Sequence, residues 1–243
     1  MTRSDPARPR GRKRAEQVAF GLVQDIVARG QHAGDKLPHE AELLAEYGVS
    51  RSSLREALRL LEVQGLVTIR PGPGSGTEVG GIDPANLAST LVLYLMMQRV
   101  NMDQLLDAWG MVEPLLADLA ARNPDRARAR ALMEPFATGA VRNDRAPASG
   151  LAFHEAVADL SGNPVLNLVL GAVGVLVTDQ VRTGARDFRL SDATVDAHEA
   201  IADAILAGDG PGAAAAMRRH LDEVKQEIRQ ALPGYHRNIY LPD

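Results

Sequence analysis

Apolar residues recur at helical spacing through the first 64 residues, in three stretches that glycines separate. The first stretch, residues 15–28, places apolar residues on one face: Val18, Leu22, Val23, Ile26 and Val27. The second begins at Leu37-Pro38 and ends at Gly48. The third, residues 51–64, follows Ser50, a residue type that caps helix N-termini, and has one apolar face: Leu54, Ala57, Leu58 and Leu61. The pattern predicts three short helices.

The pattern changes after Gly65, which ends the third helix. Residues 66–70 and 77–79 flank a run rich in glycine and proline, and this arrangement is typical of a β-hairpin. Beyond the flexible pair Gly80-Gly81, helical periodicity resumes. We expect helices at residues 84–99, 102–121, 125–140, 147–161, 164–188 and 192–231, the last divided at 208–211. Connections this short favour an antiparallel helical bundle.

The predicted fold class is therefore mainly α, with two domains. Residues 15–80 are expected to form a winged helix-turn-helix, since two helices joined by a tight glycine-containing turn precede the hairpin. Residues 83–232 are expected to form an all-α antiparallel bundle. A basic disordered arm, residues 1–14, and a C-terminal tail, residues 233–243, complete the chain.

Composition narrows the class of protein. The 243 residues are enough for two modest hydrophobic cores, and the lack of cysteine excludes disulfides and cysteine-ligated metals. No apolar run follows the basic start, so a secretory signal is not expected. The longest apolar stretches, 91–97 and 165–177, are too short or too interrupted by glycine to span a bilayer. We expect a soluble cytoplasmic protein with no membrane partner.

The net charge of −4 is unusual for a nucleic-acid binder, but the charge is unevenly distributed. The first 80 residues carry 12 Lys and Arg against 10 Asp and Glu, and the remainder carries 15 against 21. The first fourteen residues hold six basic side chains and one acid, Asp5. Such an arm either follows DNA phosphates or acts as a solubilising tail, and charge alone favours neither.

The polar face of the third helix carries the chemistry of a DNA interface. Arg51, Ser52 and Arg55 lie away from its apolar face, near the N-terminus, where free N–H groups and the helix dipole favour phosphates. Arginine can also bind guanine O6 and N7 with two hydrogen bonds in the major groove. Arg70 precedes the hairpin tip, in position to follow the neighbouring groove. The alternative is a solvated face whose arginines pair with Glu56 or Glu62.

The segment GDKLPHEAELLAEYGVSRSSLREALRLLEVQGLVTIRPGPGSGTEV resembles the winged-helix domain of the GntR family of transcription regulators. The similarity covers residues 15–80, and its most specific parts are LP-x-E, GVSR-x-x-LREAL-x-x-L and QGLV. The resemblance implies double-stranded DNA as a partner, with contacts from one set of residues: Ser50, Arg51, Ser52, Ser53 and Arg55. The family usually has Arg after the Glu of LP-x-E, where this chain has Ala41, so its operator preference is expected to differ.

Three of the six histidines fall on separate predicted helices, each on an apolar face: His154, His198 and His220. A single histidine on such a face is more often a core residue than a ligand. Three in one bundle can converge on a metal or bind an anion together, and imidazole suits Zn, Ni, Fe or Cu. Spacing alone leaves the two interpretations equal.

The second half resembles the FCD ligand-binding domain, as found in the FadR-like branch of the GntR family. Five segments carry the similarity, within residues 83–224: DPANLASTLVLYL, LDAWGMVEPLLADLAAR, FHEAVADLSGNPVL, DAHEAIADAILAGD and AMRRHL. The resemblance implies a divalent metal, Zn or Ni, held by the three histidines. Many members add an Asp four residues before the first histidine, where this chain has Gly150. An Arg common in the family is replaced by Trp109, which we expect to line the effector site with the histidines.

These departures leave two hypotheses for the bundle. A metal binds through three histidines, with water or effector at the vacant position and weaker affinity. Alternatively the metal is lost and the pocket takes a more apolar ligand such as an acyl-CoA. Losing an anionic ligand matters because its charge contributes much of the affinity for a dication.

The sequence thus predicts an effector-controlled repressor: a homodimer that binds a pseudo-palindromic operator and responds to a small organic acid or fatty acyl group. The rival is a metal-dependent hydrolase using the same histidines. A hydrolase needs a general base. The candidates, Glu155 and Glu199, each directly follow a histidine. Adjacent residues on a helix project about 100° apart, so these carboxylates would not face the same site as the histidines. A DNA-binding chromatin protein without an effector leaves the three histidines unexplained.

Overall fold

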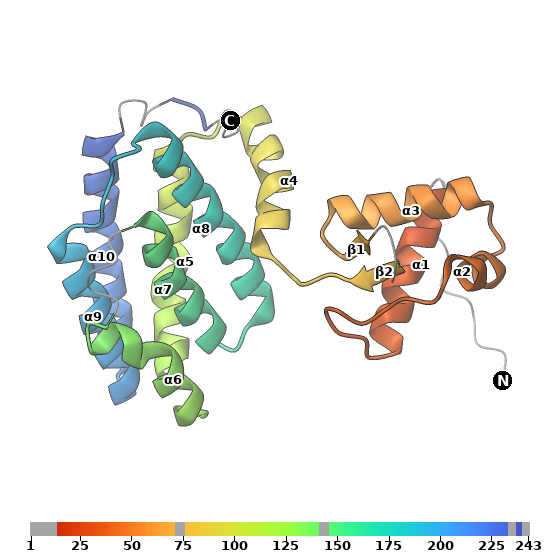
Figure 1. The fold of residues 1–243 in the computed structure, drawn as a ribbon. Helices are drawn as coiled ribbons and strands as arrows, with labels where there is room; N and C mark the ends of the chain where they lie inside the picture. The colour runs from red at the N-terminus through yellow and green to blue at the C-terminus, as the bar shows by residue number, and fades with distance from the viewer. Residues whose placement is uncertain (1–13, 71–75, 141–145, 233–236, 240–243) are drawn as a thin grey trace, which may run out of the picture. The chain divides into compact units, whose positions relative to one another are not determined.

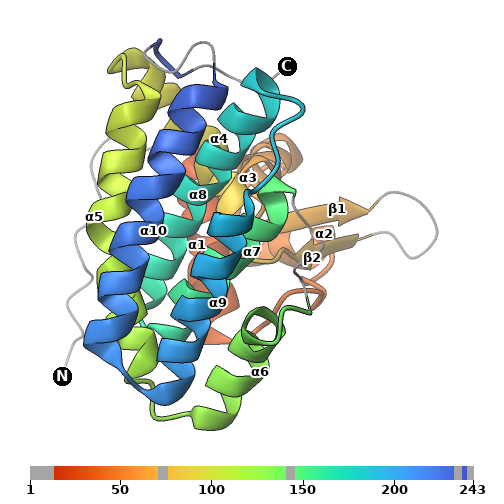
Figure 2. The same cartoon turned by 90° about the vertical axis from the view of Figure 1, so that its left-hand side faces the viewer.

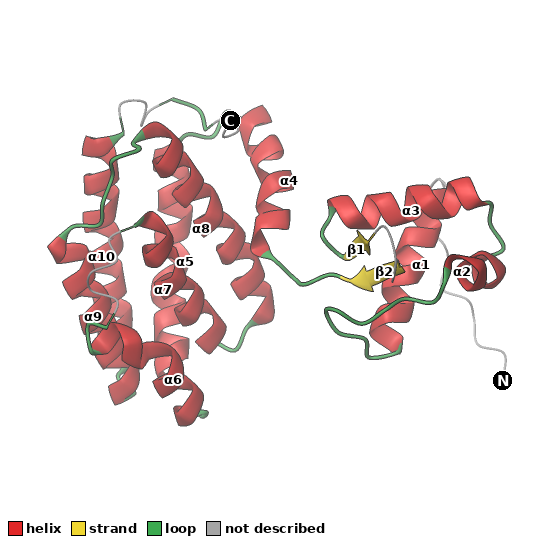
Figure 3. Cartoon of the chain, in the orientation of Figure 1, coloured by secondary structure: helices red, strands yellow, loops and turns green. Residues whose placement is uncertain are grey.

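The computed structural model describes residues 14–70, 76–140, 146–232 and 237–239. The chain divides into two compact units, residues 1–86 and 87–243 (Figure 1). The predicted disordered arm, apart from Arg14, and the tip of the predicted hairpin at 71–75 lie outside the described residues. Figure 3 separates the helices from the short strands and confirms a mainly α chain with one β-hairpin.

The first unit contains three helices and the hairpin. The helices are α1, Arg14–Ala28, α2, Glu40–Tyr47, and α3, Arg51–Val63. The strands β1, Val67–Arg70, and β2, Gly76–Val79, pair antiparallel with Val67 opposite Val79. The apolar faces of these elements form one core around Leu22, Leu54 and Leu61. Val27, which the helical stripe placed on the buried face, is 74% exposed because the buried face of α1 follows Val18, Leu22 and Ile26, and Val27 projects about 100° away from Ile26.

The second helix begins later than the sequence predicted. Residues 36 and 37 run extended beside the hairpin. The Leu37 N–H donates to the Thr77 carbonyl at 2.8 Å, and the backbone of Lys36 forms an isolated antiparallel β-bridge with that of Glu78. The helix starts at Glu40, where Glu42 accepts a hydrogen bond from the His39 N–H at 3.0 Å. It ends at Gly48, whose φ of 57° is a left-handed conformation that glycine adopts without strain. A tight turn therefore separates α2 from α3.

The second unit is a bundle of seven helices within the described ranges. They are α4, Pro84–Met97, α5, Met102–Ala121, α6, Arg126–Ala137, α7, Pro147–Leu160, α8, Pro164–Gly184, α9, Asp192–Ala207, and α10, Gly210–Ala231. Figure 2 shows α10 beside α5 and α9, and α7 packs against both α5 and α8. Buried side chains from these helices form one core that includes Leu116, Phe153, Ile201 and Met217. The split predicted at residues 208–211 is present, with Gly208 at φ 77°.

Helix α8 ends at Gly184, four residues before the predicted end, because glycine is a poor helix former and Ala185, at φ −141° and ψ 75°, has left the helical conformation. Residues 185–191 form the connection to α9. Contrary to the sequence-based expectation, α8 is long and apolar enough to cross a membrane, with mean hydropathy 1.6. This is weak evidence for a membrane span, since buried core helices pass the same test and α8 packs into the bundle.

Candidate DNA interface and metal centre

Ser50 caps α3, as its residue type predicted. Its hydroxyl accepts a hydrogen bond from the Ser53 N–H at 3.2 Å and lies 2.9 Å from the Ser52 hydroxyl. Satisfying this N–H fixes where the helix begins and which side chains point outward. Leu54, Ala57 and Leu58 are buried beneath the helix, so its polar face is turned away from the core.

The two arginines of this face are exposed. The side chain of Arg51 is 79% exposed and that of Arg55 is 71% exposed. The carboxylate that reaches both is Glu40 of α2, at 3.9 Å from each, rather than Glu56 or Glu62. Exposed pairs at such distances stabilise a protein by about 1 kcal/mol at most, and phosphate or base contacts can replace them. Both guanidinium groups are therefore available to a duplex.

Arg70 has a closer partner than the helix arginines. Its Nε donates to a Glu78 carboxylate oxygen on the neighbouring strand at 2.7 Å, while its side chain remains 65% exposed. The pair orients the guanidinium along the hairpin. Arg70 must share its charge with Glu78, so we expect it to contribute less to DNA affinity than Arg55. All six residues predicted to contact DNA thus lie in one unit, and their contacts with DNA stay a prediction.

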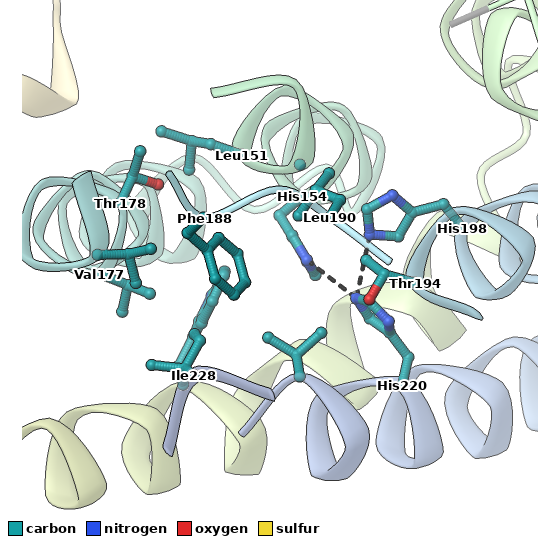
Figure 4. A pocket seen from close by; sticks show the side chains of 14 residues that line it. Leu151, His154, Val177, Thr178, Phe188, Leu190, Thr194, His198, His220 and Ile228 are labelled. Carbon is teal, nitrogen blue, oxygen red and sulfur yellow. Dashed lines mark hydrogen bonds between the residues drawn. The ribbon is translucent and has the colours of Figure 1, made fainter. Parts of the chain in front are cut away.

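The bundle brings the three histidines together from three helices (Figure 4). His154 lies on α7, His198 on α9 and His220 on α10, and all three are buried. The Nε2 atom of His220 is 3.1 Å from Nε2 of His198 and 3.4 Å from Nε2 of His154. The sequence could predict the apolar faces but not this convergence, which depends on how the helices pack.

Aromatic rings hold the cluster in place. The ring of Phe153 stacks on that of His198, with centroids 4.1 Å apart, and the ring of Trp109 lies 4.6 Å from that of His154. Burial lowers the pKa of His198, and the neighbouring imidazoles of His220 and His154 lower it further. Burial and the His154 ring likewise lower the pKa of His220. A lowered pKa favours the neutral imidazole, which is the form that binds a metal.

Glu113 is a buried residue of the histidine cluster that the sequence analysis missed. This carboxylate is 1% exposed and accepts a hydrogen bond from Trp109 Nε1 at 2.8 Å. Its other oxygen lies 3.1 Å from Nδ1 of His154. A histidine that donates its Nδ1–H to a carboxylate presents an Nε2 lone pair toward its ligand. The signal available in the sequence was an acidic residue one turn after Trp109, on the buried face of a predicted helix.

The histidine cluster fits a divalent metal. Two nitrogens bound to one ion at about 2.1 Å stand about 3.0 Å apart in octahedral and about 3.4 Å apart in tetrahedral geometry. The two Nε2 separations, 3.1 and 3.4 Å, match these values. His220 Nδ1 is buried without a hydrogen-bond partner among the described residues. Without a metal, His220 can keep its proton on Nε2, whereas binding an ion through Nε2 would place the proton on Nδ1, which has no acceptor there.

A small cavity adjoins the cluster. Its volume is about 50 Å³, and its walls are mostly apolar, from Trp109, Val177, Val181, Phe188 and Leu190. No Asp or Glu lines it within the described part of the chain. At Gly150 a Cβ atom would lie 3.3 Å from Leu190 Cδ1 and 3.9 Å from His198 Cε1. Position 150 therefore faces the cluster, and Leu190 fills the space that a side chain there would take.

Comparison with known proteins matches both halves of the chain. Residues 14–79 match the gntR family of bacterial regulatory proteins, and residues 104–223 match the FCD domain. The HTH-type transcriptional regulator LutR of Bacillus subtilis is 30% identical over 210 residues, which are 83% of this chain and 93% of LutR. The chain belongs to the gntR family of bacterial regulatory proteins.

Other members of the gntR family agree with this assignment. The HTH-type transcriptional repressor NanR of Citrobacter rodentium is 26% identical over 239 residues, covering 89% of this chain and 86% of NanR. A solved structure of Streptococcus agalactiae GntR superposes with a TM-score of 0.65 at 25% identity, covering 87% of this chain and 99% of that one. The chain is a DNA-binding transcriptional regulator with an effector-binding C-terminal domain, and nothing supports the hydrolase alternative.

Proposed function

We propose that this regulator is a repressor whose operator binding is controlled by a small carboxylate at the histidine cluster. Residues 15–80 serve as the DNA-binding domain and residues 83–232 as the effector-binding and dimerisation domain. The exposed arginines of α3, capped by Ser50, are the observation that carries DNA recognition. The similarity to a repressor, NanR, supports the direction of control.

A divalent metal, Zn or Ni, is proposed at His154, His198 and His220. The support is the convergence of three histidines, with the Nε2 atom of His220 at distances from the other two that suit one coordination sphere. When bound, the ion supplies a positive charge that attracts an anionic group. The chain orients His154 through Glu113 and His198 through the stacked ring of Phe153. We assign the chain to the FadR-like branch of the family, and the match to the FCD domain supports this assignment.

The effector is proposed to be a short carboxylate rather than a fatty acyl group. A cavity of about 50 Å³ holds a few water molecules or a carboxylate of a few heavy atoms. An acyl chain of many methylenes needs a longer apolar channel than this one. The apolar walls of the cavity favour the hydrocarbon part of such an acid, while its carboxylate would face the three histidines.

We propose that the regulator acts as a homodimer in the cytoplasm, where it reaches chromosomal DNA. Exposed apolar side chains on three bundle helices support a contact with a second copy: Leu93, Tyr94 and Met97 on α4, Met111 and Leu115 on α5, and Val165 and Val169 on α8. Covering them stabilises a dimer. Two copies of α3 would then bind half-sites roughly 34 Å apart on a pseudo-palindrome. For the effector to control DNA binding, it needs only to bind more tightly to one arrangement of the two subunits than to another, because this shifts the dimer toward that arrangement.

Fluorescence anisotropy tests this proposal. The full chain, loaded with Zn²⁺, is titrated onto a labelled duplex from upstream of its own gene and onto a shuffled duplex of the same composition. We expect tighter binding to the first duplex and release by acetate or lactate but not by an acyl-CoA. Equal affinity for both duplexes at several salt concentrations would contradict operator recognition. Failure of every short carboxylate to alter the affinity would contradict control by this class of effector.

A further inference from the structure

We propose that residues 237–239, which follow α10 along the chain, form a strap that holds the corner between α4 and α5, and that tight operator binding depends on this strap. The hold on the corner is argued from the contacts of the described residues. The dependence of operator binding rests on the proposed homodimer, because α4 carries part of the apolar surface assigned to the contact between the two copies.

The strap is attached to the corner through its backbone and through one side chain. The Ile239 N–H donates to the Val100 carbonyl at 2.9 Å, and Asn238 forms an isolated antiparallel β-bridge with Asn101. The side chain of Ile239 is buried, with 4% of the residue exposed, and belongs to the core of the bundle. A buried aliphatic side chain and a backbone hydrogen bond both oppose detachment of the strap.

The corner that the strap holds contains a residue in an unfavourable backbone conformation. Arg99 has a φ of 57°, and within the described ranges it is the one residue other than glycine with a positive φ. This left-handed conformation costs free energy for a residue with a Cβ atom, and it persists where the surrounding contacts impose it. The hydrogen bond from the strap reaches the next residue, Val100. Release of the strap would let Arg99 relax.

On the α5 side, the corner is fixed to the bundle. Met102, the first residue of α5, is 2% exposed. The next residue, Asp103, forms ion pairs with Lys225 and Arg229 of α10, at 3.0 and 3.3 Å. Because this side of the corner is anchored, relaxation at Arg99 would move the α4 side.

Helix α4 is less firmly held than α5. Of its 14 residues, Ala88 and Val92 are buried, whereas Tyr94 and Met97 near its C-terminal end are 67% and 85% exposed. The same helix begins shortly after β2 and therefore joins the bundle to the DNA-binding unit along the chain. The position of α4 sets the apolar surface offered to a second copy. Through that surface, the strap would influence how the dimer binds its operator.

Two truncations test whether the strap holds the corner. One ends the chain after residue 236 and removes the strap, and the control ends it after residue 239 and keeps it. Amide hydrogen exchange is followed by mass spectrometry at residues 94–102 and, for comparison, in α9. Without the strap, exchange at 94–102 should be about tenfold faster or more, since a backbone hydrogen bond and a buried side chain are lost, while α9 should not change. The control should match the full chain, and equal exchange in all three chains overturns the proposal.

Two point variants of the full chain keep the test decisive if the shorter truncation does not fold. Ile239→Ser removes the apolar contact, and Ile239→Val keeps most of it. Exchange at residues 94–102 should be faster in Ile239→Ser than in Ile239→Val, with circular dichroism confirming that both variants are helical. Equal exchange in these two variants overturns the proposal.

Fluorescence anisotropy with the labelled upstream duplex tests the dependence of operator binding. The Kd should rise by about tenfold without the strap and in Ile239→Ser, and stay at the full-chain value in the control truncation and in Ile239→Val. An unchanged Kd without the strap, alongside faster exchange at 94–102, overturns the dependence of operator binding and leaves the homodimer of the proposed function intact. If the full chain itself does not prefer this duplex to the shuffled one, the proposed function fails and this dependence fails with it, while hydrogen exchange still decides whether the strap holds the corner.

Discussion

Replacing Glu113 with glutamine tests whether one buried carboxylate positions the histidine cluster. The carboxylate accepts from Trp109 Nε1 and contacts His154 Nδ1, and both of these partners are buried. Glutamine keeps the shape, but its amide has one acceptor oxygen and one donor nitrogen. When His154 carries its proton on Nδ1, as it must to bind a metal through Nε2, one of the two ring N–H groups then faces another donor.

The cost follows from that mismatch. A buried donor left without an acceptor destabilises a protein by about 1–3 kcal/mol. With a urea m-value of about 2 kcal/mol/M, the unfolding midpoint of Glu113→Gln should fall by about 0.5–1.5 M. A group that orients a metal ligand contributes about 10- to 100-fold to metal affinity, so the Kd for Zn²⁺ should rise by that factor.

Urea unfolding followed by circular dichroism and tryptophan fluorescence measures the first effect, since Trp109 is the single tryptophan of the chain. Calorimetric titration with Zn²⁺ measures the second. The control is Glu223→Gln on the exposed face of α10, which should change the free energy of unfolding by less than about 0.5 kcal/mol. If Glu113→Gln unfolds at the wild-type midpoint and binds Zn²⁺ as tightly as wild type, Glu113 does not position His154.

Three further predictions concern DNA binding, capping and pH. Arg55→Ala should weaken operator binding by about 1–3 kcal/mol in an anisotropy titration without changing the circular dichroism spectrum, and undiminished affinity would remove Arg55 from the interface. Ser50→Ala loses the bond from the Ser53 N–H and should lower the free energy of unfolding by about 1 kcal/mol in urea, a result that unchanged stability would refute. The pKa values of His198 and His220 are lowered by burial, so below pH about 6.5 the unfolded chain binds protons that the folded chain does not. Metal-free stability should therefore fall with pH below about 6.5, by up to about 2.7 kcal/mol per pH unit, and stay constant above about pH 7.5. A flat profile across this range, measured in chelator, would show that the two rings are not held neutral.

Much of the fold could be predicted because local signals agreed with the packing. The apolar face of α3 predicted its burial, and the Ser50 cap and Gly48 predicted its limits. The start of α2 could not be predicted, because Leu37 is held extended by a hydrogen bond to the hairpin, which lies 40 residues further along the chain. The end of α8 was predicted four residues too late, although Gly184, a poor helix former, stands there.

The candidate site was predictable in its ligands but not in its surroundings. Three histidines on apolar faces indicated a cluster, and the bundle brings their Nε2 atoms to hydrogen-bond distances. Glu113 and Leu190 were missed because their roles arise from tertiary contacts, with His154 and with the space beside Gly150. Helical periodicity tells which side chains are buried, but it does not tell which buried side chains meet.

A footprint on the DNA upstream of the regulator's own gene tests the central claim, that α3 reads DNA through Arg51 and Arg55. The account predicts two protected half-sites, roughly one helical turn apart between their centres, that the wild-type chain protects and the Arg51→Ala, Arg55→Ala double variant does not. Protection by the double variant at the same positions and the same protein concentration would contradict it.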